Sequence, residues 1–209
     1  MTYSTLESSF KIPRIDFSRI AFFSSHGGSG TRGVVAACGK ELRAEPAIII
    51  SNNPESAIIE FAAQRGLQHE VINVKLCGSE GAVEERILQV LSEVGADLIV
   101  LSGYMRKMGD RVIERYTGRI FNIHPALLPK YGGPGMFGLN IHRAVLEAGE
   151  TETGITIHEV NQHYDEGAII AQMKVSVLPG DTVETLAERV KAEEPPFLVR
   201  TLTAMQRRS

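Results

Sequence analysis

The segment at residues 121–131, FNIHPALLPKY, places an amide and an imidazole two positions apart, at Asn122 and His124. Residues two apart in an extended strand point to the same face, so both side chains converge on one spot. Pro125 disfavours helix at the residue before it and therefore keeps the pair extended. An amide donor suits stabilisation of an oxyanion, and an imidazole suits proton transfer. The plainer alternative is a histidine whose hydrogen bonds are satisfied at the end of a strand.

Asp165 stands further along the chain, two residues before the turn glycine Gly167. It is either a turn residue or a carboxylate that orients His124 and favours its protonated form. The chain also has six histidines, which raises the question of a metal. None of them forms an HxH or HExxH pattern, so we predict no metal site.

A glycine-rich segment, SSHGGSGTRG at residues 24–33, follows a short apolar run. Glycines let backbone N–H groups approach an anion, and the start of a helix adds partial positive charge. Phosphate binding is the functional interpretation, and a tight strand-to-helix turn is the structural one. Residues 28–33 also match GxGxxG, but Asn52 and Asn53 stand where a dinucleotide site needs an acidic residue. We therefore predict one bound phosphate rather than NAD.

The elements that must position these residues alternate in type along the first half of the chain. Apolar runs and helical spacing predict strands at 19–25, 45–51, 69–74 and 96–102, with helices at 31–44, 55–65 and 82–94. Strands that are apolar on both faces and alternate with helices indicate a doubly wound, mostly parallel sheet. We therefore predict an α/β fold whose N-terminal half is Rossmann-like.

The pattern changes after residue 119. We expect a strand at 119–123, a helix at 140–147, an antiparallel strand pair at 153–160 and 168–177, and a C-terminal helix that opens at Asp181. The glycine loop and the Asn122–His124 pair come from different halves, so the site needs both halves on one sheet. We therefore predict an N-terminal extension at 1–18 and a single domain at 19–209.

The composition excludes several classes of protein. Of the 209 residues, 43% are hydrophobic and 22% are charged, and the net charge is −3. These values argue against general disorder, and against a chain-wide basic surface for nucleic acid. No apolar run reaches the ~20 residues that span a membrane, and the N-terminus has no secretory signal. Cys38 and Cys77 form no CxxC motif, so we expect a reducing, cytoplasmic location.

The FNIHPALLPKY segment, the DEG triplet at 165–167 and the GGSG loop together resemble the folate-dependent formyltransferases. The resemblance covers about residues 20–202, and the LLPKY continuation favours the glycinamide ribonucleotide branch of that family. It implies transfer of the formyl group of 10-formyltetrahydrofolate, a co-substrate, to the amine of glycinamide ribonucleotide in purine biosynthesis. The implied reaction is a direct attack through a tetrahedral intermediate, with small-molecule partners and a monomer or homodimer as the assembly.

Residue by residue, the resemblance implies a catalytic trio of Asn122, His124 and Asp165. It implies substrate contacts, in the phosphate loop and around the ribonucleotide, at Gly28, Ser29, Gly30, Gly103, Pro125 and Glu194. On the folate side it implies a segment after the fourth strand and a later loop, comprising Met105, Arg106, Lys107, Met108, Asn161, Gln162, His163 and Tyr164.

Three departures from the family pattern lead to further expectations. Gly30 replaces a usual asparagine, so the phosphate loses a side-chain contact and keeps backbone N–H groups. The segment 132–138, GGPGMFG, is longer than in shorter members and is predicted to form a mobile flap over the site. Pro195 and Pro196 follow Glu194 and remove helix N–H donors, so we predict that they kink or break the last helix.

Three other functions stay open on the sequence. A formyltetrahydrofolate hydrolase would release formate from the same folate, and an amino-sugar formyltransferase would use another amine. A non-catalytic protein would bind a sugar phosphate on the same scaffold without turnover. The complete set of Asn122, His124 and Asp165 argues against this last function.

Overall fold

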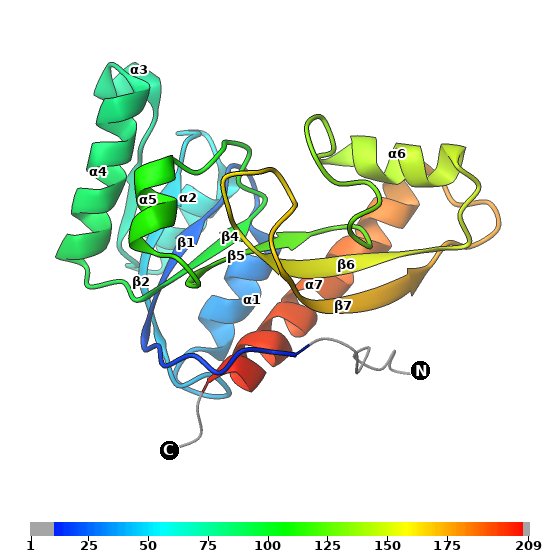
Figure 1. Cartoon of the computed structure of the whole chain (residues 1–209), viewed down its shortest axis with the longest axis horizontal. Coiled ribbons are helices and arrows are strands. Elements are labelled where there is room, and N and C mark those ends of the chain that lie inside the picture. The colour runs from blue at the N-terminus through cyan, green and yellow to red at the C-terminus, as the bar shows by residue number, and fades with distance from the viewer. Residues whose placement is uncertain (1–10, 207–209) are drawn as a thin grey trace.

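The computed structural model describes residues 11–206, whose seven strands form one sheet (Figure 1). The strands are β1 (Arg19–Phe23), β2 (Glu45–Ser51), β3 (His69–Val71), β4 (Leu98–Ser102), β5 (Ile120–His124), β6 (Glu152–Glu159) and β7 (Ile169–Ser176). Their order across the sheet is β3-β2-β1-β4-β5-β6-β7. The first five strands pair in parallel, whereas β5, β6 and β7 pair antiparallel. The predicted α/β fold, mostly parallel with an antiparallel pair at its end, is therefore confirmed.

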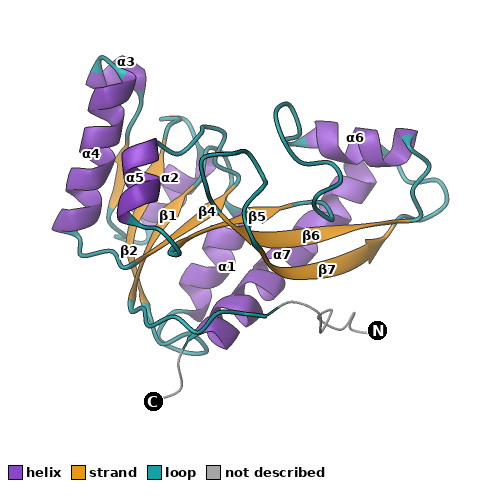
Figure 2. Ribbon diagram, in the orientation of Figure 1, coloured by secondary structure: helices purple, strands orange, loops and turns teal. Residues whose placement is uncertain are grey.

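Helices cover both faces of this sheet (Figure 2). They are α1 (Ser29–Ala37), α2 (Ala57–Gln64), α3 (Val74–Cys77), α4 (Glu80–Glu93), α5 (Asp110–Arg115), α6 (Leu139–Glu147) and α7 (Val183–Met205). The core under α1, α2, α6 and α7 contains Phe22 and Val100, and the core under α4 and α5 contains Phe23 and Leu101. Neighbouring residues of one strand thus enter opposite cores, which explains why these strands are apolar at every position.

Several helix boundaries differ from the predicted ones. The predicted helix at 31–44 is wrong at its end: α1 stops at Ala37 and begins earlier, at Ser29. The chain turns back after α1 because Gly39 has a φ of 71°. The backbones of Cys38 and Leu42 then pair in an isolated β-bridge. The short helices α3 and α5 escape the sequence patterns, since neither is long enough to show helical periodicity.

The sequence predicts that the two prolines kink or break the last helix; the predicted break is wrong, because α7 runs from Val183 to Met205 with both prolines inside it, and a kink stays a prediction. A proline in a helix interior costs about 3 kcal/mol, but burial of an apolar face can outweigh that cost. Phe197, Leu198 and Leu202 of α7 are all fully or almost fully buried in the core shared with α1. The two helices lie side by side beneath the sheet in Figure 1, and they make extensive contact.

The predicted N-terminal extension is described only in part. Residues 1–10 lie outside the described residues. Within the rest, Ile15 N–H donates to the carbonyl of Met205, and the Arg14 guanidinium donates to that of Ala204. Residues 11–18 therefore run along the end of α7, and the proposed boundary of a single domain at residue 19 stays a prediction. Between residues 11 and 206, no helix combines the length and apolar character needed to cross a membrane.

Candidate active site

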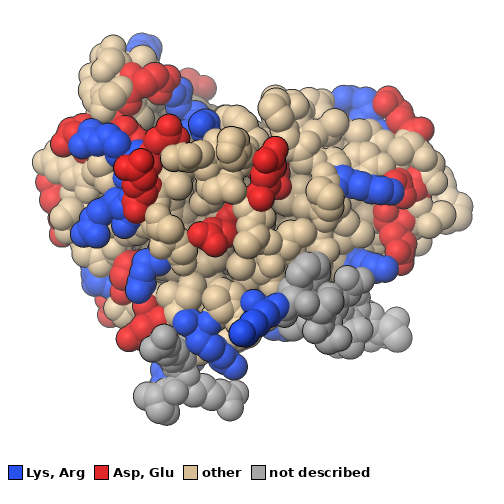
Figure 3. Space-filling view, viewed as in Figure 1, with Lys and Arg blue, Asp and Glu red and all other residues tan. Residues whose placement is uncertain are grey.

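A cavity of about 620 Å³ lies beyond the carboxyl ends of β1, β4 and β5. Ligands of open α/β sheets bind at this edge, beside the strand where the order reverses. The cavity wall includes residues 26–29, 101–108, 122–125 and 133–139, together with parts of the loop after β6 and one face of α7. In Figure 3, charges of both signs crowd the surface over α4 and α5, while the centre of the same face is mostly uncharged.

Asn122 projects from β5 and meets a histidine of the neighbouring strand. It is paired directly with His158 of β6 in the antiparallel register, and its Nδ2 donates to His158 Nε2 at 3.0 Å. The other ring nitrogen, Nδ1, donates to the carbonyl of Glu159 at 2.9 Å, which leaves a lone pair on Nε2 for the amide. His158 is buried and was not predicted, because only the pairing register of two distant strands brings it opposite Asn122.

His124 lies at the end of the same strand and is almost completely buried. Its Nε2 donates to the carbonyl of Tyr131 at 2.8 Å, and its Nδ1 lies 3.7 Å from Asp165 Oδ2. Burial lowers the pKa of His124, and the nearby Asp165 carboxylate and Tyr131 carbonyl only partly offset this. The neutral ring is therefore favoured, with its proton on Nε2 and its lone pair on Nδ1.

Asp165 reaches between two imidazoles. Its Oδ2 faces His124, and its Oδ1 lies 3.4 Å from His158 Nε2. Burial by itself raises the pKa of this carboxyl group, but the N–H of Gly133, together with His158 and His124 whenever these rings carry a proton toward it, outweighs burial, so the pKa lies below its usual range. The backbone of Asp165 has a φ of 56°, which is uncommon for a residue other than glycine. Asp165 therefore remains ionised beside the two rings.

The glycine loop enters the cavity wall as far as the start of α1. Gly28 has a φ of 55° and caps α1, and Gly27, Gly28 and Ser29 line the cavity. Gly30 does not line it. A Cβ on Gly30 would lie 2.9 Å from Ser102 Oγ and 3.0 Å from a methyl carbon of Leu198, so the space beside this backbone is filled.

Glu194 approaches this loop from α7. Ser29 Oγ donates to Glu194 Oε2 at 2.5 Å. Burial raises the pKa of Glu194, against the opposing effects of the Ser29 hydrogen bond and the charge of Lys191. Lys191, one helical turn earlier, also lines the cavity and was not predicted. The helical spacing of Lys191 and Glu194 was the available signal, since residues three apart share a face.

The segments expected on the folate side form the opposite wall. Met105, Arg106, Lys107 and Met108 all line the cavity, as do Gly103 and Pro125. Met105 N–H donates to Ser25 Oγ at 2.7 Å, which ties this segment to the end of β1. Arg106 forms an ion pair with Glu80 at the start of α4.

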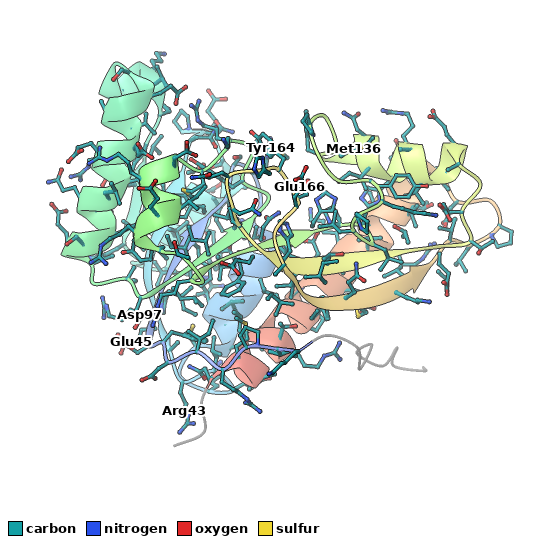
Figure 4. All side chains as sticks on the ribbon, viewed as in Figure 1. Arg43, Glu45, Asp97, Met136, Tyr164 and Glu166 are labelled. Atoms are coloured by element: carbon teal, nitrogen blue, oxygen red, sulfur yellow. The ribbon has the colours of Figure 1, made fainter. Side chains whose placement is uncertain are left out.

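The loop after β6 completes the enclosure. Asn161, His163 and Tyr164 line the cavity, whereas Gln162 is exposed and points elsewhere. Figure 4 shows Tyr164 on this loop and Met136 on the loop before α6, two cavity-lining residues that come from different parts of the sequence. The structure thus brings all three predicted catalytic residues and most of the predicted contacts to one cavity, and leaves Gly30 and Gln162 off its wall.

No cluster of three or more histidine, cysteine or carboxylate side chains suited to a metal ion occurs within residues 11–206. The chemistry of the cavity instead rests on an amide, two imidazoles and a carboxylate in contact. Such a set stabilises a negative oxygen and moves a proton between two nitrogen atoms.

Comparison with known proteins gives a consistent result. A family model described as formyl transferase matches residues 18–202. The phosphoribosylglycinamide formyltransferase of Haemophilus influenzae is 34% identical over 177 residues, covering 84% of this chain and 81% of that protein. The chloroplastic phosphoribosylglycinamide formyltransferase of Arabidopsis thaliana is 36% identical over 189 residues, which are 90% of this chain. The chain spans only 65% of that plant relative's length.

Solved structures agree with this result. The phosphoribosylglycinamide formyltransferase of Bacillus halodurans matches with a TM-score of 0.82 and 33% identity, over 90% of this chain and 95% of that one. The corresponding enzyme of Brucella melitensis matches with a TM-score of 0.81 and 38% identity, with the same coverage of both chains. A formyltetrahydrofolate deformylase from Pseudomonas syringae is 22% identical with a TM-score of 0.79, a likeness that concerns the fold alone.

Proposed function

The chain belongs to the formyl transferase family, and we propose that it transfers the formyl group of 10-formyltetrahydrofolate to the amine of glycinamide ribonucleotide in purine biosynthesis. The observation that carries this proposal is that Asn122, His124 and Asp165 line one cavity, where Asp165 lies beside His124 and His158, and His158 pairs with Asn122. The names of the relatives supply the substrates, and the contacts supply a means of moving the formyl group.

In the proposed reaction the substrate amine attacks the formyl carbon, forming one C–N bond and leaving a negative oxygen. One N–H of the Asn122 amide already donates to His158, so its second N–H remains for that oxygen. Neutral His124 accepts the proton of the amine at Nδ1, and Asp165 stabilises the resulting imidazolium. The proton then passes to the folate nitrogen as its bond to the formyl carbon breaks, so that atoms and charges balance.

The two ends of the cavity suit the two substrates. At one end, the backbone of Gly27–Ser29 at the start of α1 and the ammonium of Lys191 offer donors to a phosphate, and Glu194 offers an acceptor to a ribose hydroxyl. At the other end, Met105 and Tyr164 present exposed apolar surface to the flat rings of the folate. The folate is a co-substrate in this proposal, and no metal takes part.

The proposal predicts the behaviour of three variants, Asn122→Ala, His124→Ala and Asp165→Asn. Each removes a donor or acceptor from the reacting atoms, and we expect a loss of roughly 10²–10³ in kcat. The measurement is formyl transfer with both substrates present, with circular dichroism to show that the fold is intact. Wild-type rates in all three folded variants would overturn the assignment of the site.

The same assay separates the alternatives. Formate released from the folate without glycinamide ribonucleotide would identify a hydrolase, and transfer to an amino sugar would identify a different acceptor. Ligand-dependent thermal stabilisation without any turnover would identify a sugar-phosphate-binding protein. A cytoplasmic location, and a monomer or homodimer as the assembly, are part of the proposal.

A further inference from the structure

Two backbone groups at the start of the predicted flap, one in Tyr131 just before it and one in Gly133, bind His124 and Asp165. The Tyr131 carbonyl accepts from His124 Nε2 at 2.8 Å, and Gly133 N–H donates to Asp165 Oδ2 at 2.9 Å. Between them, a Cβ on Gly132 would lie 2.6 Å from a methyl carbon of Leu128 and 3.1 Å from the Cβ of Asp165. The backbone of this segment therefore lies against the proposed proton carrier, His124, and the carboxylate that stabilises its charge, Asp165.

The contact to His124 decides which ring nitrogen is free. A carbonyl only accepts hydrogen bonds, so this contact places the proton of the neutral ring on Nε2. The lone pair is then on Nδ1, which faces Asp165 at 3.7 Å. This is the tautomer that accepts a proton at the nitrogen the carboxylate stabilises. Among residues 11–206, the Tyr131 carbonyl is the one group that accepts a hydrogen bond from Nε2, so that tautomer depends on this contact.

The carbonyl of Tyr131 is held in place by its own side chain. Tyr131 has a φ of 58°, a left-handed conformation that costs free energy for any residue with a Cβ. Its ring packs against the core, and its hydroxyl donates to Glu150 Oε1 at 2.9 Å. Glu150 follows the end of α6 and is absent from the cavity wall. The same carboxylate also accepts from Lys130 Nζ, whose side chain is 70% exposed.

We propose that Tyr131 and Glu150 are positioning residues for the transfer reaction, because their hydrogen bond holds the Tyr131 carbonyl on His124 and Gly133 N–H on Asp165. The consequence for catalysis rests on the proposed function. The state of the His124 ring does not, since it is a property of the protein without substrate. The other titratable groups that face the pair, His158 and His142, come from β6 and α6 and make no contact with Glu150.

The first test measures the tautomer and the pKa of the His124 ring directly. Nitrogen NMR of the full chain with labelled histidines, with the His124 signals assigned by their loss in His124→Asn, reports the tautomer and the pKa. We expect the Nε2–H tautomer in the wild type. In Tyr131→Phe and Glu150→Ala we expect a mixture of tautomers and a lower His124 pKa, because the imidazolium loses its carbonyl acceptor. Glu150→Gln keeps an oxygen acceptor and should restore the wild-type spectrum.

The second test measures catalysis. We expect kcat to fall between about 10- and 100-fold in Tyr131→Phe and Glu150→Ala, with little change in KM, because the reacting groups are displaced while the substrate contacts remain. Gly132→Ala should also lower kcat, since its Cβ would press on Leu128 and on Asp165 and the segment would have to shift. Lys130→Ala is the matched control, because it removes the exposed ion pair and leaves the Tyr131–Glu150 hydrogen bond intact.

The outcomes are separable. An unchanged His124 spectrum in Tyr131→Phe and Glu150→Ala would overturn the inference, whatever the activity. Altered spectra with no formyl transfer by the wild type would support the positioning role and contradict the proposed function. Equal losses in Glu150→Gln and Glu150→Ala would also overturn the inference, because a hydrogen-bond acceptor would then not be what matters.

Discussion

His142 shows how the cavity changes the chemistry of a single residue. It projects from α6 into the cavity wall, is only 4% exposed, and its Nδ1 finds no hydrogen-bond partner among residues 11–206. Burial above all lowers its pKa to about 4, and repulsion from the His124 ring when that ring is protonated adds to the effect. The folded protein therefore keeps this ring neutral over a range of pH in which the unfolded chain protonates it.

This difference predicts a pH dependence of stability. Between about pH 6.5 and about 4 the unfolded chain binds a proton at His142 that the folded chain does not, so stability is lost as the pH falls through this window. The loss approaches about 3 kcal/mol at its limit. Urea unfolding at several pH values gives the free energy of unfolding as a function of pH. Between about pH 6.5 and about 4, this free energy should fall less steeply for His142→Gln than for the wild type. His163→Gln, at an exposed position, is the control and should keep the wild-type dependence of the free energy of unfolding on pH. The same pH dependence in all three proteins would contradict this account.

For single residues, the sequence predicts the placement of those whose position depends on local backbone geometry. Alternation along a strand placed Asn122 and His124 on one face, and the structure has both in the cavity wall. The residues left two interpretations of Asp165, a turn residue or a partner of His124, and the family resemblance favoured the second, because no spacing relates Asp165 to β5. His158 escaped prediction altogether, since strand register across the sheet, rather than any local pattern, sets it opposite Asn122.

At the scale of elements, the contact between α1 and α7 is so close that it tolerates no added side-chain atom at Gly33. The position of Gly33 in α1 has no room for a Cβ, which would overlap Pro195 of α7. Glycine usually weakens a helix by about 1 kcal/mol relative to alanine, so its presence here has a cost. The close approach of α7 explains why glycine stands at this position despite its low helix propensity. The same contact helps to stabilise α7, although that helix contains two prolines.

Replacing Gly33 by alanine should therefore destabilise the protein. We expect a loss of about 1–3 kcal/mol in the free energy of unfolding, because overpacking at the α1–α7 contact outweighs the better helix propensity. Gly81→Ala is the matched control: it lies in α4, a Cβ there would meet nothing within 4 Å, and its φ is not positive. That variant should gain about 0.4–1 kcal/mol. Denaturant unfolding measures both, and a gain at both positions would sink the packing argument.

Sequence patterns predicted the long elements and failed at the contacts between them. Continuous apolar runs identified β1, β2 and β4, because strands buried on both faces leave a local signature. The effect of Pro195 and Pro196 was misjudged, because the stabilising partner of α7 lies about 160 residues earlier in the chain. Intrinsic propensity is a weak prior whenever tertiary packing decides.

On the scale of the whole molecule, exposed apolar side chains gather at the cavity. Within residues 11–206, six large hydrophobic residues have substantial exposure, namely Leu76, Met105, Phe137, Leu139, Tyr164 and Leu178. Four of these line the cavity, on the segment after β4, the loop before α6 and the loop after β6. Because exposed apolar surface is unfavourable in water, its concentration at one opening indicates that a ligand covers it.

Phe137 offers the sharpest test of this distribution. It lies on the predicted flap, lines the cavity and is 54% exposed, so it adds little to folding and has apolar surface left for a bound folate. Covering that surface is worth about 1–1.5 kcal/mol, so Phe137→Ala should raise the KM for the formyl folate about tenfold. The KM for the ribonucleotide and the melting temperature should change little.

Leu178→Ala provides the comparison, since Leu178 is 49% exposed but lies between β7 and α7, off the cavity wall. Both substitutions remove a half-exposed apolar side chain, so any general effect on the surface appears in both. A raised folate KM in Phe137→Ala alone shows that the flap covers the folate. Equal KM values for the formyl folate in the two variants would instead mean that the folate does not contact Phe137. The exposure of the four apolar side chains at the cavity would then not be explained by a bound folate.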